Sequence, residues 1–197
     1  MFVRDLMTDH AITVNRDTPV KEALALLEQH RITAVPVIDP SGRIQGVVSE
    51  VDLIRDVVPL DQRAHERPSQ PVLHDRPRVV ADVMSTHPVT VKPTTDVAAA
   101  IELMATLNIK SVPVVDPDQR VLGILSRSDV VRVLAQSDDE LERQVDAVLT
   151  EVGLGDWLVA VKDGEVHLTG PEDSPYLMTA RAVAESVPGV VGVQVRP

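Results

Sequence analysis

The hydrophobic pattern of the chain is clearest between residues 112 and 129, where two apolar runs enclose a polar turn. Val112–Val115 and Val121–Leu125 predict two strands, and Asp116–Asp118 predicts the turn between them. Ser126 follows the second run with Asp129 three residues later, a spacing that predicts a helix start. The free N–H groups and the positive dipole end of that helix would form an anion site at the end of a buried strand.

The same pattern occurs a second time, earlier in the chain. The two copies align without a gap, and the matched positions are Val35–Pro40 with Val112–Pro117, Gly46 with Gly123, Ser49 with Ser126 and Asp52 with Asp129. A duplicated unit of this size buries its apolar face against its twin. We therefore expect an α+β fold with two βαββα-type repeats packed about a pseudo-twofold axis.

Within each repeat the order strand, helix, strand, strand, helix is expected. Ile12–Val14 predicts the first strand, Thr18 a helix cap and Pro19 the first helical residue, since proline has no N–H to satisfy there. Apolar residues then recur at helical spacing and predict a buried face: Val20, Ala23, Leu24 and Leu27. In the second repeat Thr95 takes the capping position.

These patterns divide the chain into repeat 1 (1–58), a long connection (59–79), repeat 2 (80–136) and a tail (137–197). The tail predicts an amphipathic helix from Asp138, with its acidic residues at the positive end of the dipole. Asp163-Gly164 between alternating apolar runs predicts a hairpin. A helix over Ser174–Ser186 and a strand over Val190–Val195 complete a small α+β domain.

Composition narrows the classes of function. The net charge of −11 and pI near 4.9 argue against nucleic-acid binding and against membrane contact, because both need a basic face. There is no cysteine, no secretory signal and no run near the ~20 apolar residues of a membrane span. We expect a soluble cytoplasmic protein.

Several motifs in fixed order resemble a known family. Val3–Thr8, Ala81–Ser85, the two Val-Pro-Val strands and the two Gly-x-x-Ser-x-x-Asp segments are similar to a tandem pair of CBS domains, the Bateman module. The resemblance implies a regulatory, non-catalytic module whose clefts between the repeats bind adenosine-containing ligands such as AMP, ADP, ATP or S-adenosylmethionine.

The tail resembles a BON domain. Val161–Gly170 and Val187–Val193 carry that resemblance, which implies a small α+β fold. The family's association with envelope or phospholipid contact is not carried over, because this copy is not basic.

The resemblance also implies candidate ligand-binding residues, since the aspartate of Gly-x-x-Ser-x-x-Asp commonly holds the ribose hydroxyls and the serine and its neighbours approach phosphate. In the second cleft the matching and neighbouring residues are Ser126, Arg127, Ser128, Asp129, Lys110, Ser111, Pro113 and Thr90. In the first cleft they are Ser49, Asp52, Pro36 and Thr13. Because Glu50 and Val51 replace Arg127 and Ser128, we expect an adenosine phosphate mainly in the second cleft.

Each assignment has a structural alternative. Ser-x-x-Asp caps its own helix without any ligand, a contribution of ~1 kcal/mol. The histidines have no metal-ligand spacing, and no Walker loop, dinucleotide fingerprint or nucleophile elbow is present, so we expect neither a metal nor enzymatic activity.

We therefore predict a homodimeric ligand sensor that controls a protein partner. The alternative is a non-catalytic interaction protein with empty clefts, whose tail docks a partner or an envelope surface.

Overall fold

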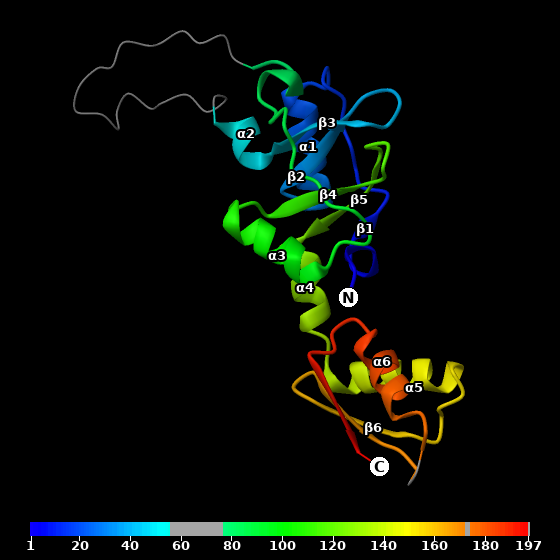
Figure 1. Cartoon of the computed structure of the whole chain (residues 1–197). Helices are drawn as coiled ribbons and strands as arrows, with labels where there is room; N and C mark the ends of the chain where they lie inside the picture. The colour runs from blue at the N-terminus through cyan, green and yellow to red at the C-terminus, as the bar shows by residue number, and fades with distance from the viewer. Residues whose placement is uncertain (56–76, 172–173, 197) are drawn as a thin grey trace, which may run out of the picture. The chain divides into compact units, whose positions relative to one another are not determined.

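The computed structural model describes residues 1–55, 77–171 and 174–196, which form two compact units (Figure 1). The repeat unit comprises Thr8–Pro93 and Glu102–Leu125, and the tail unit comprises Met1–Met7, Thr94–Ile101 and Ser126–Pro197. Most of the predicted connection, residues 59–76, lies outside the described residues. None of the described helices is long and apolar enough to cross a membrane.

The elements of the repeat unit are β1 (Thr8–Asp9), α1 (Val20–His30), β2 (Ala34–Ile38), β3 (Ile44–Ser49), α2 (Glu50–Ile54), η3 (Val80–Asp82), β4 (Ser111–Val115) and β5 (Val121–Ser126, with Ser126 itself in the tail unit). The elements of the tail unit are η1 (Val3–Asp5), α4 (Arg127–Leu134), α5 (Asp138–Glu151), β6 (Leu158–Lys162), β7 (Glu165–Thr169), α6 (Leu177–Glu185) and β8 (Gly192–Arg196). Helix α3 (Val97–Thr106) contributes residues to both units.

Strands β2 and β3 form the predicted hairpin, with Ala34 opposite Ser49. The Asp39 carboxylate closes its turn by accepting hydrogen bonds from the Ser41 hydroxyl (2.6 Å) and from the backbone N–H groups of Ser41 and Arg43. Led by the Ser41 hydroxyl, these bonds hold the pKa of Asp39 below its ordinary value of 3.8. Gly42 takes the left-handed φ of 82° that the turn requires.

The entry segment of each repeat pairs with a strand of the other repeat. Thr8 lies opposite Ile124 in the sheet β1-β5-β4, and Ser85 forms an antiparallel bridge with Val47 on β3. Strand β1 was not predicted, and the predicted strand Ile12–Val14 is wrong in extent, because only its last residue makes a bridge, to Val37. The two repeats are therefore joined by backbone pairing near the start of each copy.

Helix α1 begins one residue later than predicted. Pro19 is its N-cap residue, and the Thr18 hydroxyl accepts the N–H of Asn15 (3.1 Å) within a turn instead of capping the helix. The predicted buried face is confirmed for Val20, Ala23 and Leu27. These side chains join one hydrophobic cluster with residues of β2, β3, α2, η3 and the segment that follows η3: Val35, Val37, Val48, Leu53, Val80 and Met84.

In the tail unit the amphipathic helix is confirmed as α5, which buries Leu141, Val145 and Leu149. Its first residue, Asp138, accepts the N–H groups of Asp163 (2.8 Å) and Gly164 (2.9 Å), so the helix fixes the turn of the predicted β6–β7 hairpin. Strand β8 adds in parallel to β7, α5 packs against β6 and α6 against β8 (Figure 1).

The core of the tail is built around Trp157, whose exposed fraction is 3%. Its ring lies against Gly170, where an added Cβ would stand 2.6 Å from a ring carbon. The last two elements are shorter than predicted. Tyr176 caps α6 after a turn, and the N–H of Val191 is bonded to the Gly164 carbonyl of the hairpin turn, so β8 begins only at residue 192.

Candidate functional site

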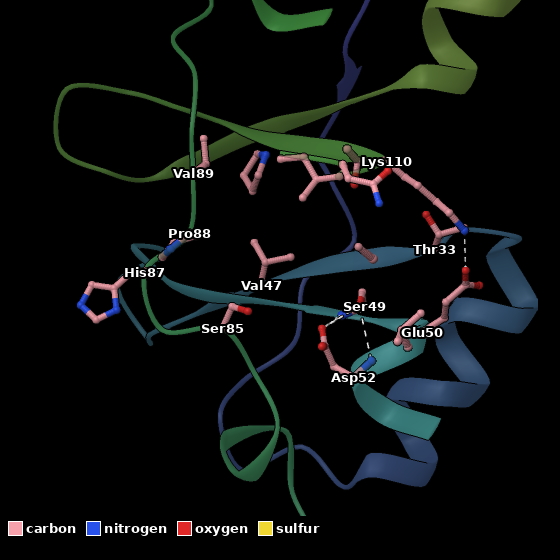
Figure 2. Close-up of a pocket in the computed structure, with 16 residues that line it drawn as sticks. Thr33, Val47, Ser49, Glu50, Asp52, Ser85, His87, Pro88, Val89 and Lys110 are labelled. Atoms are coloured by element: carbon pink, nitrogen blue, oxygen red, sulfur yellow. Dashed lines mark hydrogen bonds and ion pairs between the residues drawn. The ribbon is translucent and has the colours of Figure 1, made fainter. Parts of the chain in front are cut away.

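A pocket of about 290 Å³ lies within the repeat unit (Figure 2). This volume is close to the lower end of the range, about 300–1,000 Å³, of small-molecule sites. The residues that line it come from both repeats: Thr33, Ala34, Val47, Ser49, Glu50, Val51, Asp52, Ser85, His87, Pro88, Val89, Asn108, Ile109, Lys110, Ser111 and Pro113. The pocket is therefore a cleft between the two copies of the duplicated unit.

Ser49 and Asp52 are held in the pocket by the start of α2. Ser49 is the N-cap residue, and its hydroxyl and backbone N–H both donate to Asp52 Oδ2, at 2.6 and 3.0 Å. The Asp52 N–H returns a longer bond of 3.4 Å to the Ser49 hydroxyl, which completes a capping box. Asp52 Oδ1 accepts no hydrogen bond from the described residues, so one carboxylate oxygen in the pocket keeps its capacity as an acceptor.

The pocket has two chemically different ends (Figure 2). Residues 87–89 lie at one end, where Pro88 and Val89 supply apolar surface. Thr33, Glu50 and Lys110 lie at the other end, and Asp52 lies between the two. A ligand with an apolar planar group, a pair of hydroxyls and a polar substituent would match this sequence of surfaces.

The wall formed by Ser85 and residues 87–89 is positioned by a close backbone approach. Val47 and Ser85 exchange two backbone hydrogen bonds of 3.1 and 2.9 Å. The approach requires Gly46, because an added Cβ there would stand 2.5 Å from the Ser85 carbonyl oxygen and 3.1 Å from Met84 Sδ. In the first repeat, this close approach of Ser85 to β3 explains why position 46 is a glycine.

An ion pair joins the two repeats at the polar end. Lys110 Nζ lies 2.6 Å from Glu50 Oε1, and the side chains keep exposed fractions of 59% and 41% (Figure 2). Lys110 precedes β4 of the second repeat, whereas Glu50 is the first residue of α2 in the first. The ammonium group of Lys110 is therefore already paired with a carboxylate.

The corresponding residues of the second repeat have a different arrangement. Ser126 caps α4, and its hydroxyl and N–H donate to Asp129 Oδ2 at 2.6 and 2.8 Å. The other oxygen, Oδ1, accepts a bond of 2.7 Å from Arg132 Nη2, and Asp129 is only 4% exposed. Both oxygens of this buried carboxylate are thus engaged by the protein's own groups.

The structure brings together only some of the predicted site residues. Ser49 and Asp52 share the pocket with Lys110, Ser111 and Pro113, which the sequence analysis had grouped with Asp129. Thr13, Pro36 and Thr90 belong to the repeat unit but do not line this pocket, and Ser126, Arg127, Ser128 and Asp129 belong to the tail unit.

Sequence reasoning did not select Thr33, Ser85, Asn108 or residues 87–89, although they line the pocket. The repeat alignment held a usable signal, because Thr33 occupies in the first copy the position that Lys110 occupies in the second. Among the described residues no group of three or more His, Asp or Glu side chains could hold a metal ion.

The similarity to known proteins lies in the two repeats. The family model described as CBS domain matches residues 3–59 and 80–136. A CBS domain-containing protein of Dictyostelium discoideum is 31% identical over 136 residues, which cover 68% of this chain and 91% of that protein. The matched family segments end at residue 136, so the likeness of residues 137–197 to a BON domain stays a prediction.

Two solved structures with bound nucleotides are similar to the chain. Arabidopsis thaliana CBSX2 in complex with AMP shares 31% identity with a TM-score of 0.53, over 66% of this chain and 93% of that chain. The cytosolic domain of the Mg²⁺ channel MgtE in complex with ATP shares 30% identity with a TM-score of 0.50, over 67% of this chain and 50% of that chain.

Proposed function

The chain belongs to the CBS domain family, and from this premise we propose that it is a non-catalytic regulatory protein whose cleft beside Asp52 binds an adenosine-containing ligand. The AMP complex of CBSX2 and the ATP complex of the MgtE domain support the ligand class. The observation that carries the proposal for this chain is Asp52 Oδ1, which accepts no hydrogen bond from residues 1–55, 77–171 and 174–196 and lies between an apolar end and a polar end of one pocket.

The ligand would lie along the pocket in one direction. Its adenine ring would pack on Pro88 and Val89, and Asp52 Oδ1 would accept hydrogen bonds from the ribose hydroxyls. The 5′ substituent would then reach the end formed by Glu50 and Lys110. In this orientation the apolar end of the pocket contacts the base, the carboxylate contacts the ribose and the polar end contacts the 5′ substituent.

The proposal places the primary site in the first cleft rather than beside Asp129. Asp129 Oδ2 accepts both bonds from Ser126, and a ribose hydroxyl at Oδ1 would share that oxygen with Arg132. A ligand at Asp129 would therefore compete with Arg132 for Oδ1, whereas a ligand at Asp52 would not meet such a competitor among the described residues.

Binding would act on a partner by favouring one packing arrangement of the two repeats over another. A ligand shifts such an equilibrium only by its difference in affinity for the two arrangements. The proposal has three further parts. The tail is a BON-like domain that transmits this change, the protein is a homodimer formed through the helices, and its location is cytoplasmic.

The test is a thermal-shift and calorimetry panel with adenosine, AMP, ATP and GMP on the full chain. At a ligand concentration of ~100 times the dissociation constant, binding adds ~2.7 kcal/mol to the free energy of unfolding. Asp52→Asn should weaken adenosine binding at least tenfold, whereas the exposed turn variant Asp118→Asn should leave it unchanged. An unshifted midpoint with every nucleotide would instead favour an interaction protein with empty clefts.

A further inference from the structure

Resting on the proposed function, we infer that Glu50 sets the charge of the ligand. The cleft takes an adenosine whose 5′ substituent is neutral or cationic, such as a thioether or a sulfonium, and discriminates against a 5′-phosphate. The AMP complex of CBSX2 contains a phosphate, so this inference restricts the ligand beyond what the comparison supports.

The first step is the charge of the pocket. Among the lining residues in the described part of the chain, Lys110 is the only lysine or arginine, whereas Glu50 and Asp52 are two carboxylates. The formal charge of the cleft with neutral His87 is therefore negative. His87 lies at the opposite end of the pocket from Lys110 and does not alter the balance where the 5′ group would lie (Figure 2).

The second step is the state of Lys110. Its ammonium group is 2.6 Å from Glu50 Oε1, so a phosphate that approached it would also approach the glutamate. The phosphate would have to pull Lys110 out of this pair or accept a carboxylate as its neighbour, and either arrangement places like charges together. Helix α2 does not offset this repulsion, because it has only five residues and carries Glu50 and Asp52 in its first turn.

The third step concerns ligands without a phosphate. A neutral 5′ substituent leaves the Glu50–Lys110 pair intact and loses nothing at this end. A sulfonium adds a positive charge beside Glu50, which attracts it. The same residue that repels a nucleotide thus favours a cationic adenosine.

The experiment measures affinities of adenosine, methylthioadenosine, S-adenosylmethionine and AMP by calorimetry at low and high salt. The full-length chain is compared with Glu50→Gln, with Lys110→Met and with a control, Glu28→Gln, whose side chain is exposed on α1. Wild-type protein should bind S-adenosylmethionine more tightly than AMP. Glu50→Gln should tighten AMP at least about fivefold and weaken the sulfonium by a similar factor, since fivefold is the effect of one unit charge about 4 Å away with the full screening of bulk water.

Adenosine serves as the internal control, because it has no charge at the 5′ position. Its affinity should be the same in wild type and Glu28→Gln, the ratio of AMP affinity to adenosine affinity should rise in Glu50→Gln, and the difference between AMP and adenosine should shrink at high salt. Lys110→Met should weaken AMP further, since it leaves Glu50 without its cation.

The outcomes separate the inference from the function on which it rests. If wild-type protein binds AMP as tightly as adenosine, and Glu50→Gln leaves that ratio unchanged, the charge inference is wrong although the cleft is an adenosine site. If neither wild type nor Glu50→Gln binds adenosine, the proposed function itself fails. Thermal midpoints measured without ligand establish that the variants are folded.

Discussion

Gly46→Ala should damage both the stability of the repeat unit and its ligand pocket. The new methyl carbon would stand 2.5 Å from the Ser85 carbonyl oxygen, a separation that real Cβ atoms do not adopt, and 3.1 Å from Met84 Sδ. The segment at Ser85 must therefore move away from β3. That movement strains the two backbone hydrogen bonds between Val47 and Ser85 and shifts the wall that carries Pro88 and Val89.

The expected cost follows from the packing. Overfilling a close contact costs about 1–3 kcal/mol, and each kcal/mol lowers the midpoint by about 2–4 °C in a chain of this size. Thermal unfolding followed by circular dichroism should therefore show a midpoint lowered by about 2–12 °C. Adenosine affinity, measured by calorimetry, should fall as well, because the apolar end of the pocket is displaced.

Gly192→Ala is the matched control. Its new Cβ would meet only the Glu165 side chain, at 3.7 Å or more, so the unfolding midpoint should change little. If Gly46→Ala retains the wild-type midpoint and the wild-type affinity, the crossing at Ser85 does not position the pocket and the reasoning is wrong.

Three further predictions concern stability. Gly170→Ala drives a methyl group into the Trp157 ring at 2.6 Å, so it should cost about 1–3 kcal/mol and change the fluorescence of the single tryptophan; an unchanged spectrum would contradict the packing. Asp138→Ala removes the acceptor for two N–H groups of the hairpin turn and should cost about 1–3 kcal/mol in urea unfolding, with faster amide exchange there; unchanged exchange would refute it. The Ser41 hydroxyl and nearby N–H groups lower the pKa of Asp39 in the folded protein. The stability advantage of wild type over Asp39→Asn should therefore be complete above pH 3.8, the ordinary pKa, and should disappear as the pH falls further. A difference in unfolding midpoint that stays constant across acid pH would exclude this contribution.

Much of the fold follows from local patterns. The Ser-x-x-Asp spacing predicts both capping boxes, which the structure confirms at Ser49 and Ser126. The Asp163-Gly164 pair predicts the tail hairpin, and the acidic first turn predicts α5. These features depend on residues within a few positions of one another, so the sequence alone contains the relevant physics.

The remaining features depend on distant contacts. Strand β1 has two residues and forms only because Thr8 meets Ile124, a pairing that no local pattern indicates. The sequence indicated that Glu50 disfavours phosphate in the first cleft. It did not predict the ion pair with Lys110, because that pair joins residues of two different repeats. The grouping of Lys110 with Asp129 rather than Asp52 has the same origin, because position along the chain does not reveal which strand ends meet across a duplicated fold.

The most direct test of the account is a crystal structure of the full chain grown with adenosine. The account predicts electron density in the first cleft, with the ribose hydroxyls within hydrogen-bonding distance of Asp52 Oδ1 and the base against Pro88 and Val89. A cleft without ligand at saturating adenosine, or a ribose held by Asp129 alone, would contradict it.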